Sequence, residues 1–527
     1  MMGKQQTQAS LFVPGFDLGS RIPPDHPLRA IQAHVDFSFV RKEVAHLYGY
    51  NGNVSVDPEV VLKMMFLLFY YDIKSERELM RVIQYRLDFQ WFLGYTLDDT
   101  IPDHSVLSKA RRRWGPTVFE SLFVRTVAQC VGAGLVDGTK VHLDGSLVDA
   151  DASNASVLKG PPAVVDPFRR VYIDQEAKLS DLVESTPDEP SDGDAADAED
   201  EAWPPAALTD EGAQDAPERY ERVNKGLLST TDPDATVVRK GQQKPHLRYK
   251  NHRAVDDACG VITATITTSG DGKENGQMIP LVDQHEHNTG MKVETAVADS
   301  QYGTVENFRA CGQRGIRPHM ADLATAQKGT GRRKGIFDES RFIYDPATDT
   351  YRCPAGQTLK RRRHRKARRA YEYTAGPKVC GACRLRSQCT RAKRAARTLK
   401  RHEDQDAIDA ARAESASAAA KRDRRRRKHL MEGSFADAAN NHGFKRSRWR
   451  RLWRQQIQDY LIAAVQNIRI LLRHGRLRES GTQASVRGFS VAARHSVLTF
   501  WRALWAVVRA VGAAVAPGWV IDPTPGC

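Results

Sequence analysis

The fold of this chain is decided by the stretch VHLDGS at residues 141–146. Apolar and polar residues alternate along it, which is typical of a half-buried β-strand, and Gly145 is prone to form a turn at its end. A second strand is predicted by the stretch TAVAD at residues 295–299, which also runs into an acidic residue. We therefore expect Asp144 and Asp299 to stand at the ends of two strands.

The segments around these two stretches predict a sheet of mixed direction. A hairpin is expected from strands at residues 248–255 and 260–267. A helix at residues 305–310 and a short strand at residues 316–320 follow the second aspartate. The order strand, hairpin, strand, helix, strand predicts a mixed α/β sheet with a long insertion after its first strand.

Residues 1 to about 135 are expected to be mostly helical. One helix should begin after Asp57, because this N-cap residue precedes a proline at the first helical position. Another should begin at Ser75, which stands three residues before Glu78 as in a capping box. These signals predict an all-helical N-terminal region.

Basic residues are in excess over the whole chain. Its 527 residues include 79 Lys and Arg against 64 Asp and Glu, which gives a net charge of +15 and a pI of about 9.4. Such an excess favours a polyanionic partner, and nucleic acid is the first candidate. The helix expected at residues 102–114 ends in three arginines, Arg111, Arg112 and Arg113. They could contact DNA or form the solvated face of a helical bundle.

The hydropathy of the chain limits where it can act. A mean hydropathy of −0.52 excludes a polytopic membrane protein. The first residues contain no apolar segment as long as a secretory signal requires, so we expect a cytoplasmic protein. The apolar stretch from Ser496 to Pro517 carries Arg502 and Arg509, so we interpret it as a surface or partner helix rather than a bilayer span.

Two insertions interrupt the predicted sheet. The first is strongly acidic between Asp181 and Tyr220 and rich in Pro and Ala, a composition that predicts disorder. The second is dense in Lys and Arg, with near-continuous basic runs at residues 360–369 and 421–428, which could be solvated or bind phosphates. An amphipathic helix is expected from Leu452 to Leu472.

Three acidic residues are candidates for the chemistry: Asp144, Asp299 and Glu432. Two carboxylates at neighbouring strand ends, joined by a third from a helix, suit two Mg²⁺ or Mn²⁺ ions, which activate an attacking oxygen and stabilise a leaving one. By spacing alone the trio is weakly specific, because each Asp could equally be a turn or cap residue.

The short motifs around these acids make the trio more specific. With these motifs the chain resembles the bacterial insertion-sequence transposases of the Asp-Asp-Glu type, whose catalytic core is RNase H-like. The resemblance lies in four places in order: the stretch from Val54 through SEREL at 75–79 to PDHS at 102–105, the word HLDGS at 142–146, the word ADSQYG at 298–303, and MEGSF at 431–435 followed by HGFKR at 442–446. These words span residues 54 to about 475, which is most of the chain.

The resemblance implies an α/β fold with an RNase H-like mixed-sheet core, an all-helical N-terminal domain and two insertions. It implies Asp144, Asp299 and Glu432 as ligands of two Mg²⁺ or Mn²⁺ ions. Near the DNA ends it places Tyr302 and basic residues that follow the glutamate: His442, Lys445 and Arg446.

The chain departs from the family pattern on both sides of Glu432. Many relatives have an Arg four residues before the Glu and a Lys seven after it, where this chain has Lys428 and Ala439. Lys428 keeps the charge and could contact DNA, but it lacks the fork geometry of arginine. Lys445 or Arg446 could replace the phosphate contact that Ala439 does not offer. If this alignment is wrong, two rival third acids remain: Glu403 and Glu414.

Four cysteines form a second constellation, with the spacing C-x26-C-x2-C-x5-C: Cys353, Cys380, Cys383 and Cys389. Two turns that carry four thiolates suit tetrahedral Zn²⁺, although the last interval is longer than usual. A similar cysteine insertion occurs in one subgroup of these transposases. The alternative is four reduced cysteines in a basic insertion.

We therefore expect a DNA transposase that binds the terminal inverted repeats of its element, cuts them and joins the ends to target DNA, as a homodimer or larger assembly. One alternative is a catalytically inactive DNA-binding repressor or domesticated transposase. Another is an RNase H-like nuclease without strand transfer.

The predicted organisation has seven segments. They are a helical DNA-binding and dimerisation domain at 1–135, the catalytic core in two parts at 136–178 and 245–324, the acidic insertion at 179–244, the cysteine-containing insertion at 325–424, the final catalytic helix region at 425–475 and a tail at 476–527.

Overall fold

A computed structural model describes residues 2–3, 17–49, 54–160, 227–242, 244–322, 335–366, 369–392 and 395–479. The acidic stretch from Asp181 to Tyr220 and the apolar stretch from Ser496 to Pro517 lie outside these residues. The chain divides into compact units at residues 1–472 and 473–527, and the account below concerns the first. Within the described residues, no helix is both long and apolar enough to span a bilayer.

The N-terminal region is helical, as predicted. Its helices are α1 (Leu18–Arg21), α2 (Pro27–His34), α3 (Phe39–Val44), α4 (Pro58–Tyr70), α5 (Glu76–Tyr85), α6 (Leu87–Leu93), α7 (Ser105–Trp114) and α8 (Thr117–Gly132), with a 3-10 turn at Ala45–Leu47. Both predicted helix starts are confirmed: the Asp57 side chain accepts a hydrogen bond from the Glu59 amide at 2.9 Å, and Ser75 Oγ accepts one from the Glu78 amide at 3.1 Å.

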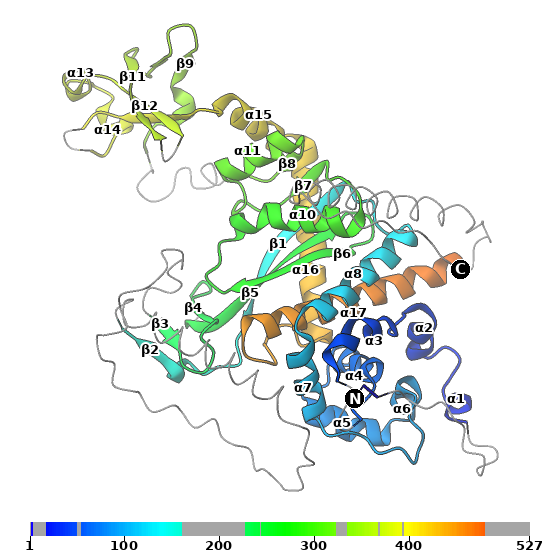
Figure 1. The fold of residues 1–527 in the computed structure, drawn as a ribbon. Coiled ribbons are helices and arrows are strands. Elements are labelled where there is room, and N and C mark those ends of the chain that lie inside the picture. The colour runs from blue at the N-terminus through cyan, green and yellow to red at the C-terminus, as the bar shows by residue number, and fades with distance from the viewer. Residues whose placement is uncertain are drawn as a thin grey trace, which may run out of the picture. The chain divides into compact units, whose positions relative to one another are not determined.

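A mixed sheet forms the centre of the unit (Figure 1). Its strands are β1 (Lys140–Asp149), β4 (Thr236–Val238), β5 (His246–Asp256), β6 (Ile262–Ser269), β7 (Thr295–Val297) and β8 (Arg317–His319). The order across the sheet is β6-β5-β1-β7-β8, and β4 pairs with the far end of β5. Strand β5 is antiparallel to β1 and β6, whereas β7 and β8 continue parallel to β1. The mixed α/β sheet that the sequence predicted is therefore confirmed.

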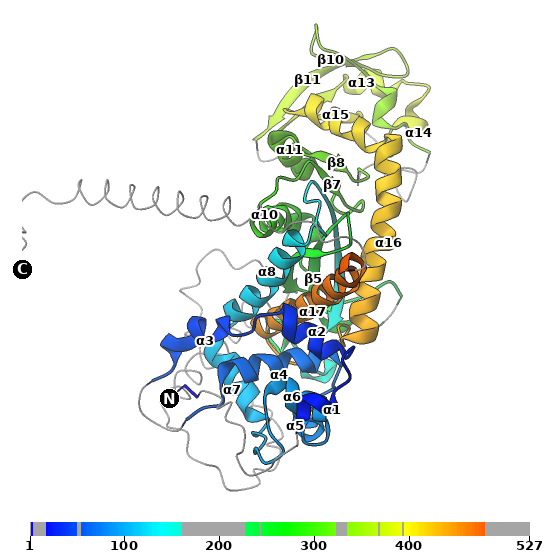
Figure 2. The ribbon, with the colours of Figure 1, turned by 90° about the vertical axis from the view of Figure 1, so that its right-hand side faces the viewer.

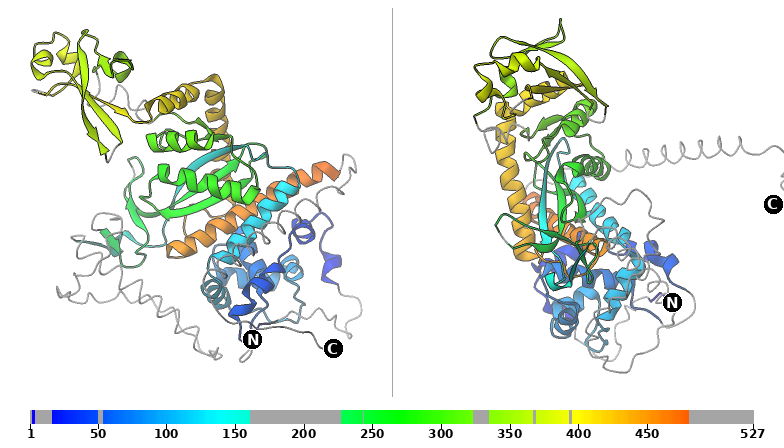
Figure 3. Two further views of the ribbon diagram at one scale, coloured as in Figure 1. Left: turned by 45° about the horizontal axis from the view of Figure 1, so that its top comes forward. Right: turned by 90° about the vertical axis from the view of Figure 1, so that its left-hand side faces the viewer.

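Helices cover both faces of the sheet, and Figure 3 gives two further views of this layering. On one face lie α10 (Met278–Thr289) and α11 (Val305–Arg314), and Val141 and Leu143 of β1 pack there against Leu281. The other face is covered by α16 (Ala418–Asn441) and α17 (Leu452–Glu479), and Val148 belongs to that core. Because successive strand residues face opposite sides, Asp144 lies on the α16 side.

Helix α16 is a single helix of 24 residues that runs past the sheet (Figure 2). A preceding helix, α15 (Gln405–Ser415), packs against α11 and β8. The predicted amphipathic helix that follows is confirmed as α17, because Ile457, Leu461, Val465 and Ile468 are all fully buried. One core therefore joins α16 and α17 to the N-terminal helices.

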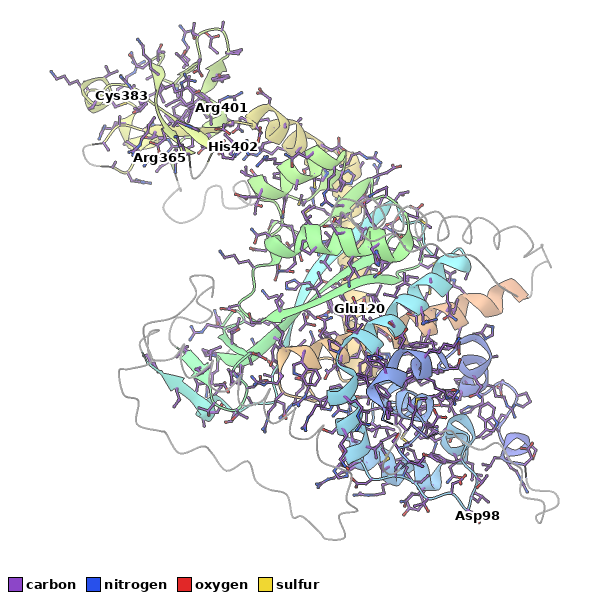
Figure 4. The ribbon with its side chains drawn as sticks, viewed as in Figure 1. Asp98, Glu120, Arg365, Cys383, Arg401 and His402 are labelled. Atoms are coloured by element: carbon purple, nitrogen blue, oxygen red, sulfur yellow. The ribbon has the colours of Figure 1, made fainter. Side chains whose placement is uncertain are left out.

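The basic second insertion contains a sheet that the sequence did not predict. Its strands β9 (Ile343–Asp345), β10 (Thr350–Arg352), β11 (Thr358–Arg365), β12 (Ala370–Thr374) and β13 (Thr398–His402) pair antiparallel in the order β13-β12-β11-β10-β9. Short helices α13 (Pro377–Gly381) and α14 (Arg386–Cys389) carry cysteines beside it. Figure 4 labels Arg365, Cys383, Arg401 and His402 in this part. Its small core is formed by Phe342, Leu359, Tyr373, Ala375 and Leu399.

The remaining described elements are short. They are the hairpin of β2 (Val157–Lys159) and β3 (Leu227–Ser229), and 3-10 turns at Asn154–Ser156, Glu274–Gln277 and Glu339–Arg341. The turn Glu274–Gln277 connects β6 to α10 directly, at the end of the sheet toward which β1 runs.

Candidate active site

Asp144 and Asp299 lie beside each other on neighbouring parallel strands. The ladder pairs Val141 with Ala296 and His142 with Val297, and two more steps of the same register bring Asp144 level with Asp299. Strand β7 ends at Val297, whereas β1 continues to Asp149. The second aspartate therefore stands just past its strand end, at the level of the first.

Burial and charge both act on Asp144. Desolvation raises the pKa of its carboxyl, the Arg427 guanidinium lowers it, and the neighbouring Asp299 carboxylate raises it again. Arg427 donates a hydrogen bond of 2.7 Å to Asp144 Oδ2, and the Gly145 amide donates one of 2.9 Å to Oδ1. No sequence pattern singles out Arg427, which stands one residue before Lys428 in the basic run. The two residues differ in the face of α16 that they occupy: Arg427 reaches Asp144, whereas Lys428 lies beside Glu432.

Glu432 is on α16 but points away from the sheet. The residues of α16 that face inward include Met431, Phe435 and Ala438, all buried. The side chain of Glu432 is 66 % exposed, and its carboxylate lies 4.0 Å from the Lys428 ammonium one turn earlier. The helix thus brings Glu432 to the side of the sheet that carries Asp144, with its carboxylate turned to solvent.

The two rival third acids lie elsewhere. Glu403 accepts hydrogen bonds from Arg369 at 2.9 Å and pairs with His364 at 2.8 Å, within the cysteine-containing insertion. Glu414, at the end of α15, pairs with His319 of β8 at 3.2 Å. Among the described residues, no three His, Cys, Asp or Glu side chains stand close enough to hold a metal ion in the present geometry.

A fourth acid, Glu274, lies within electrostatic reach of Asp144 and Asp299, and no sequence pattern pointed to it. Its carboxyl has a raised pKa, caused first by burial, lowered by Lys250 and raised again by Asp299 and Asp144. The phenol of Tyr302 is fully buried in the same region, and burial together with Glu274, Asp144 and Asp299 raises its pKa well above the usual value.

The basic segment HGFKR at 442–446, which follows Glu432, lies along the strand that carries Asp144. The Asp149 amide donates to the Lys445 carbonyl at 2.9 Å, and the Ser447 amide donates to the Asp149 carbonyl at 2.7 Å, so this loop extends the edge of β1. Lys445 Nζ donates to Ser146 Oγ at 2.9 Å, on the same face as Asp144. Both Lys445 and Arg446 are exposed, as is Lys428.

Three residues expected to contact DNA are buried instead. Tyr302 and His442 are both 0 % exposed, and His442 Nδ1 is 2.8 Å from the Phe69 carbonyl. Arg111 is 4 % exposed, forms an ion pair with Glu76 and stacks on Trp449. The DNA contacts expected of these three side chains do not agree with their burial, because a buried side chain offers no surface to a duplex. Arg112 and Arg113 are partly exposed.

The four cysteines gather in one place. Cys353, Cys380, Cys383 and Cys389 line a single small cavity of about 30 Å³ beside the β9–β13 sheet, and none is in a disulfide. Burial raises the pKa of the Cys389 thiol, and the other three thiols raise it further. The fold therefore brings together the four residues that the spacing singled out, although their sulfurs do not form a ligand set as they stand.

Comparisons with known proteins match two regions of the chain. The family model described as Transposase domain (DUF772) matches residues 16–113, and the one described as Transposase DDE domain matches residues 352–472. The second match begins just before Cys353 and includes α16 and α17. No curated protein was found to match the chain.

A cryo-EM structure of the piggyBac transposase synaptic complex with hairpin DNA aligns with 87 % of this chain and 77 % of that one, at 10 % identity and a TM-score of 0.34. The two family matches lie on either side of the strands that carry Asp144 and Asp299, one on the N-terminal helices and one on the helix that carries Glu432. The chain therefore carries two regions that match transposase families, and the second of them matches a DDE domain.

Proposed function

We propose that this chain is a DNA transposase that binds the terminal inverted repeats of its element, cuts the DNA there and joins the 3′-hydroxyl ends to target DNA. The observation that carries the proposal is the alignment of Asp144 with Asp299 on parallel strands of the mixed sheet. Each cut and each joining is an in-line attack at phosphorus, by water or by a DNA hydroxyl, so one acidic pocket serves both steps.

The residues fit divalent cations of the Mg²⁺ or Mn²⁺ kind. Asp144 and Asp299 offer hard carboxylate oxygens side by side, and two such ions bound there would activate the attacking oxygen and stabilise the leaving one. Glu432 is proposed as the ligand from α16. To reach the ions, the exposed side chain of Glu432 would have to rotate toward Asp144, since its carboxylate is now 4.0 Å from the Lys428 ammonium.

Exposed basic residues near Asp144 would hold the DNA backbone. Lys445 and Arg446 follow the edge of β1 beyond Asp144, and Lys428 lies on α16 next to Arg427. Contacts of this kind add affinity without sequence preference and weaken as salt rises. The N-terminal helices, with Arg112 and Arg113 at the end of α7, are proposed to read the repeats. Two DNA ends must meet, so a homodimer or larger assembly is proposed, acting on the bacterial nucleoid in the cytoplasm.

The cysteine-containing insertion is proposed to hold one structural Zn²⁺. The support is that Cys353, Cys380, Cys383 and Cys389 share one cavity, and thiolates are the ligands zinc favours in closed structural sites. The four thiolates would hold the ion once their sulfurs come together, because they do not form a ligand set as they stand. The exposed basic residues of β11 would then present a fixed surface to target DNA.

The test is cleavage and strand transfer on a labelled duplex that carries the DNA termini flanking the gene. Wild type is compared with Asp299→Asn in Mg²⁺, Mn²⁺ or EDTA. We expect metal-dependent nicks and joined products that the variant does not form. Cuts without joined products would indicate a nuclease, and binding without cuts would indicate an inactive DNA-binding protein.

A further inference from the structure

Glu274 stands against the strand that carries the first aspartate. A methyl group placed on Gly145 would come within 3.3 Å of Glu274 Cγ and 3.4 Å of its carboxyl carbon, so the carboxyl group lies directly beside the residue after Asp144. Lys250 Nζ lies 3.4 Å from Glu274 Oε1 and donates to the Gly272 carbonyl at 2.9 Å. The position of Glu274 is thus fixed by the strand next to β1.

The early end of β7 leaves room for a group from the α10 side to reach the strand acids. The described β1–β7 ladder stops at His142 and Val297, and the next pairing beside β1 is the bridge of Asp149 with Arg446. Glu274 begins the turn that leads into α10, on the face opposite α16. Arg427 of α16 therefore reaches Asp144 from one face of the sheet, and Glu274 lies beside Gly145 on the other.

A buried hydroxyl points to a ligand in the same place. Tyr302 is 0 % exposed, and its hydroxyl has no hydrogen-bond partner among the described residues, although Glu274, Asp144 and Asp299 are its charged neighbours. Asn307 connects Tyr302 to the turn that carries Glu274, because Asn307 Nδ2 donates to the carbonyls of Tyr302 at 2.9 Å and Asn275 at 3.0 Å. An unpaired buried polar group is costly, which favours a bound partner that supplies the missing bond.

We propose that Glu274 is a carboxylate of the divalent-cation pocket formed by Asp144 and Asp299, and that the Tyr302 hydroxyl hydrogen-bonds to a ligand held in that pocket. The inference rests on the proposed function, because it concerns the same pocket. It adds a third acid, from the turn after β6, that lies beside Gly145 and within electrostatic reach of the pair, while the carboxylate of Glu432 faces solvent. The three carboxylates would have to close around the ion, because they do not form a ligand set as they stand.

The experiment measures Mn²⁺ binding to the full chain without DNA, from the electron paramagnetic resonance signal of the free ion. Glu274→Gln removes one charge and keeps the shape. Glu306→Gln is the matched control, because it removes the same charge from an exposed residue of α11, four residues after Tyr302 in the chain. We expect Glu274→Gln and Asp299→Asn each to weaken Mn²⁺ binding by about tenfold or more, and Glu306→Gln to change it less than about twofold.

The outcomes separate this inference from the proposed function. If Glu274→Gln binds Mn²⁺ as tightly as wild type while Asp299→Asn does not, the role of Glu274 is overturned. The cation site at Asp144 and Asp299 is then still supported. Wild-type affinity in Asp299→Asn and Asp144→Asn, or no Mn²⁺ binding by the wild type, overturns the pocket itself. If Glu274→Gln does not fold, Glu274→Asp takes its place. That variant keeps the charge but is one methylene shorter, so affinity equal to wild type would overturn the inference.

Discussion

Arg427 donates a hydrogen bond of 2.7 Å to the carboxylate of Asp144, so the helix that carries Glu432 also carries the cation that neutralises the first strand acid. The guanidinium occupies a position from which a metal ion would approach the same oxygen. A divalent cation bound to Asp144, as proposed, would therefore compete with Arg427 for this carboxylate.

Replacing Arg427 with Gln should separate these two effects. Loss of the charge-assisted bond is expected to lower the free energy of unfolding in EDTA by about 1–3 kcal/mol. Loss of the competing charge is expected to tighten Mn²⁺ binding several-fold. Chemical denaturation and Mn²⁺ titration measure the two quantities. Arg426→Gln is the control, because Arg426 pairs with Asp257 instead, at 2.6 Å. A weaker Mn²⁺ affinity in Arg427→Gln would mean that the arginine supports the ion rather than competing with it.

Much of the sheet could be predicted because its strands follow simple patterns. The alternation in residues 141–146 and the apolar run before Asp299 predict β1 and β7, and the structure places both strands within a few residues of the expected bounds. Helix α10 could not be predicted, since its stretch contains Pro280 and several polar residues and gains its burial from distant elements, among them β5, β6 and α8.

The β9–β13 sheet of the basic insertion could not be predicted for a related reason. Strand β11 reads TLKRRRHR and exposes every residue except Leu359, so its charges carry no alternation that would reveal a strand. Glu274 was equally hidden, because its place beside Gly145 depends on its pairing with Lys250 of β5 rather than on any local motif. Contacts between distant segments set both features, and sequence patterns report mainly on local structure.

Tyr302→Phe tests the unpaired hydroxyl directly. In EDTA the change removes a buried polar atom without a partner, so the melting temperature should stay equal or rise. In Mn²⁺ the variant should gain less thermal stability than wild type, because the hydroxyl can no longer bond to the bound ligand. Differential scanning calorimetry with and without Mn²⁺ measures both. A clear loss of stability in EDTA would show that the hydroxyl already has a partner, such as a buried water.

The four clustered cysteines should bind one zinc per chain. Elemental analysis of purified protein is expected to give about one Zn²⁺, and Cys383→Ser or Cys389→Ser should abolish it, because a structural site with three thiolates binds far more weakly. Cys311→Ser is the matched control, since Cys311 is buried against the main sheet instead. Zinc retained in both cluster variants would refute the site.

Asp459 should make stability fall as the pH rises through the weakly acidic range. Burial raises the pKa of this carboxyl to about 6, against the opposing effects of Thr267 and Arg253. The folded state thus binds the proton more tightly than the unfolded chain, whose Asp pKa is about 3.9. This contribution is full below pH 4 and is lost as the pH passes 6, which amounts to about 3 kcal/mol.

Urea unfolding between pH 4 and pH 8 measures this effect. Relative to wild type, Asp459→Asn should lose less stability over that range. Asp437→Asn should leave the pH dependence over this range unchanged, because hydrogen bonding from His442 lowers the pKa of Asp437 and its stabilisation is lost only below about pH 4. Parallel pH curves for wild type and Asp459→Asn would mean that the carboxyl titrates normally.

Gly145 is expected to set how closely Glu274 approaches the strand acids. An alanine there would place its methyl 3.2 Å from His252 Nδ1 and 3.3 Å from Glu274 Cγ, so both side chains must retreat by a few tenths of an ångström. We expect Gly145→Ala to weaken Mn²⁺ binding a few-fold and to lower the free energy of unfolding by about 1 kcal/mol. In a Glu274→Gln background the same change should leave Mn²⁺ binding unaltered, since the carboxylate that it displaces is already gone. Additive effects of the two substitutions on Mn²⁺ affinity would instead show that Gly145 acts on the pocket through Asp144 and not through Glu274.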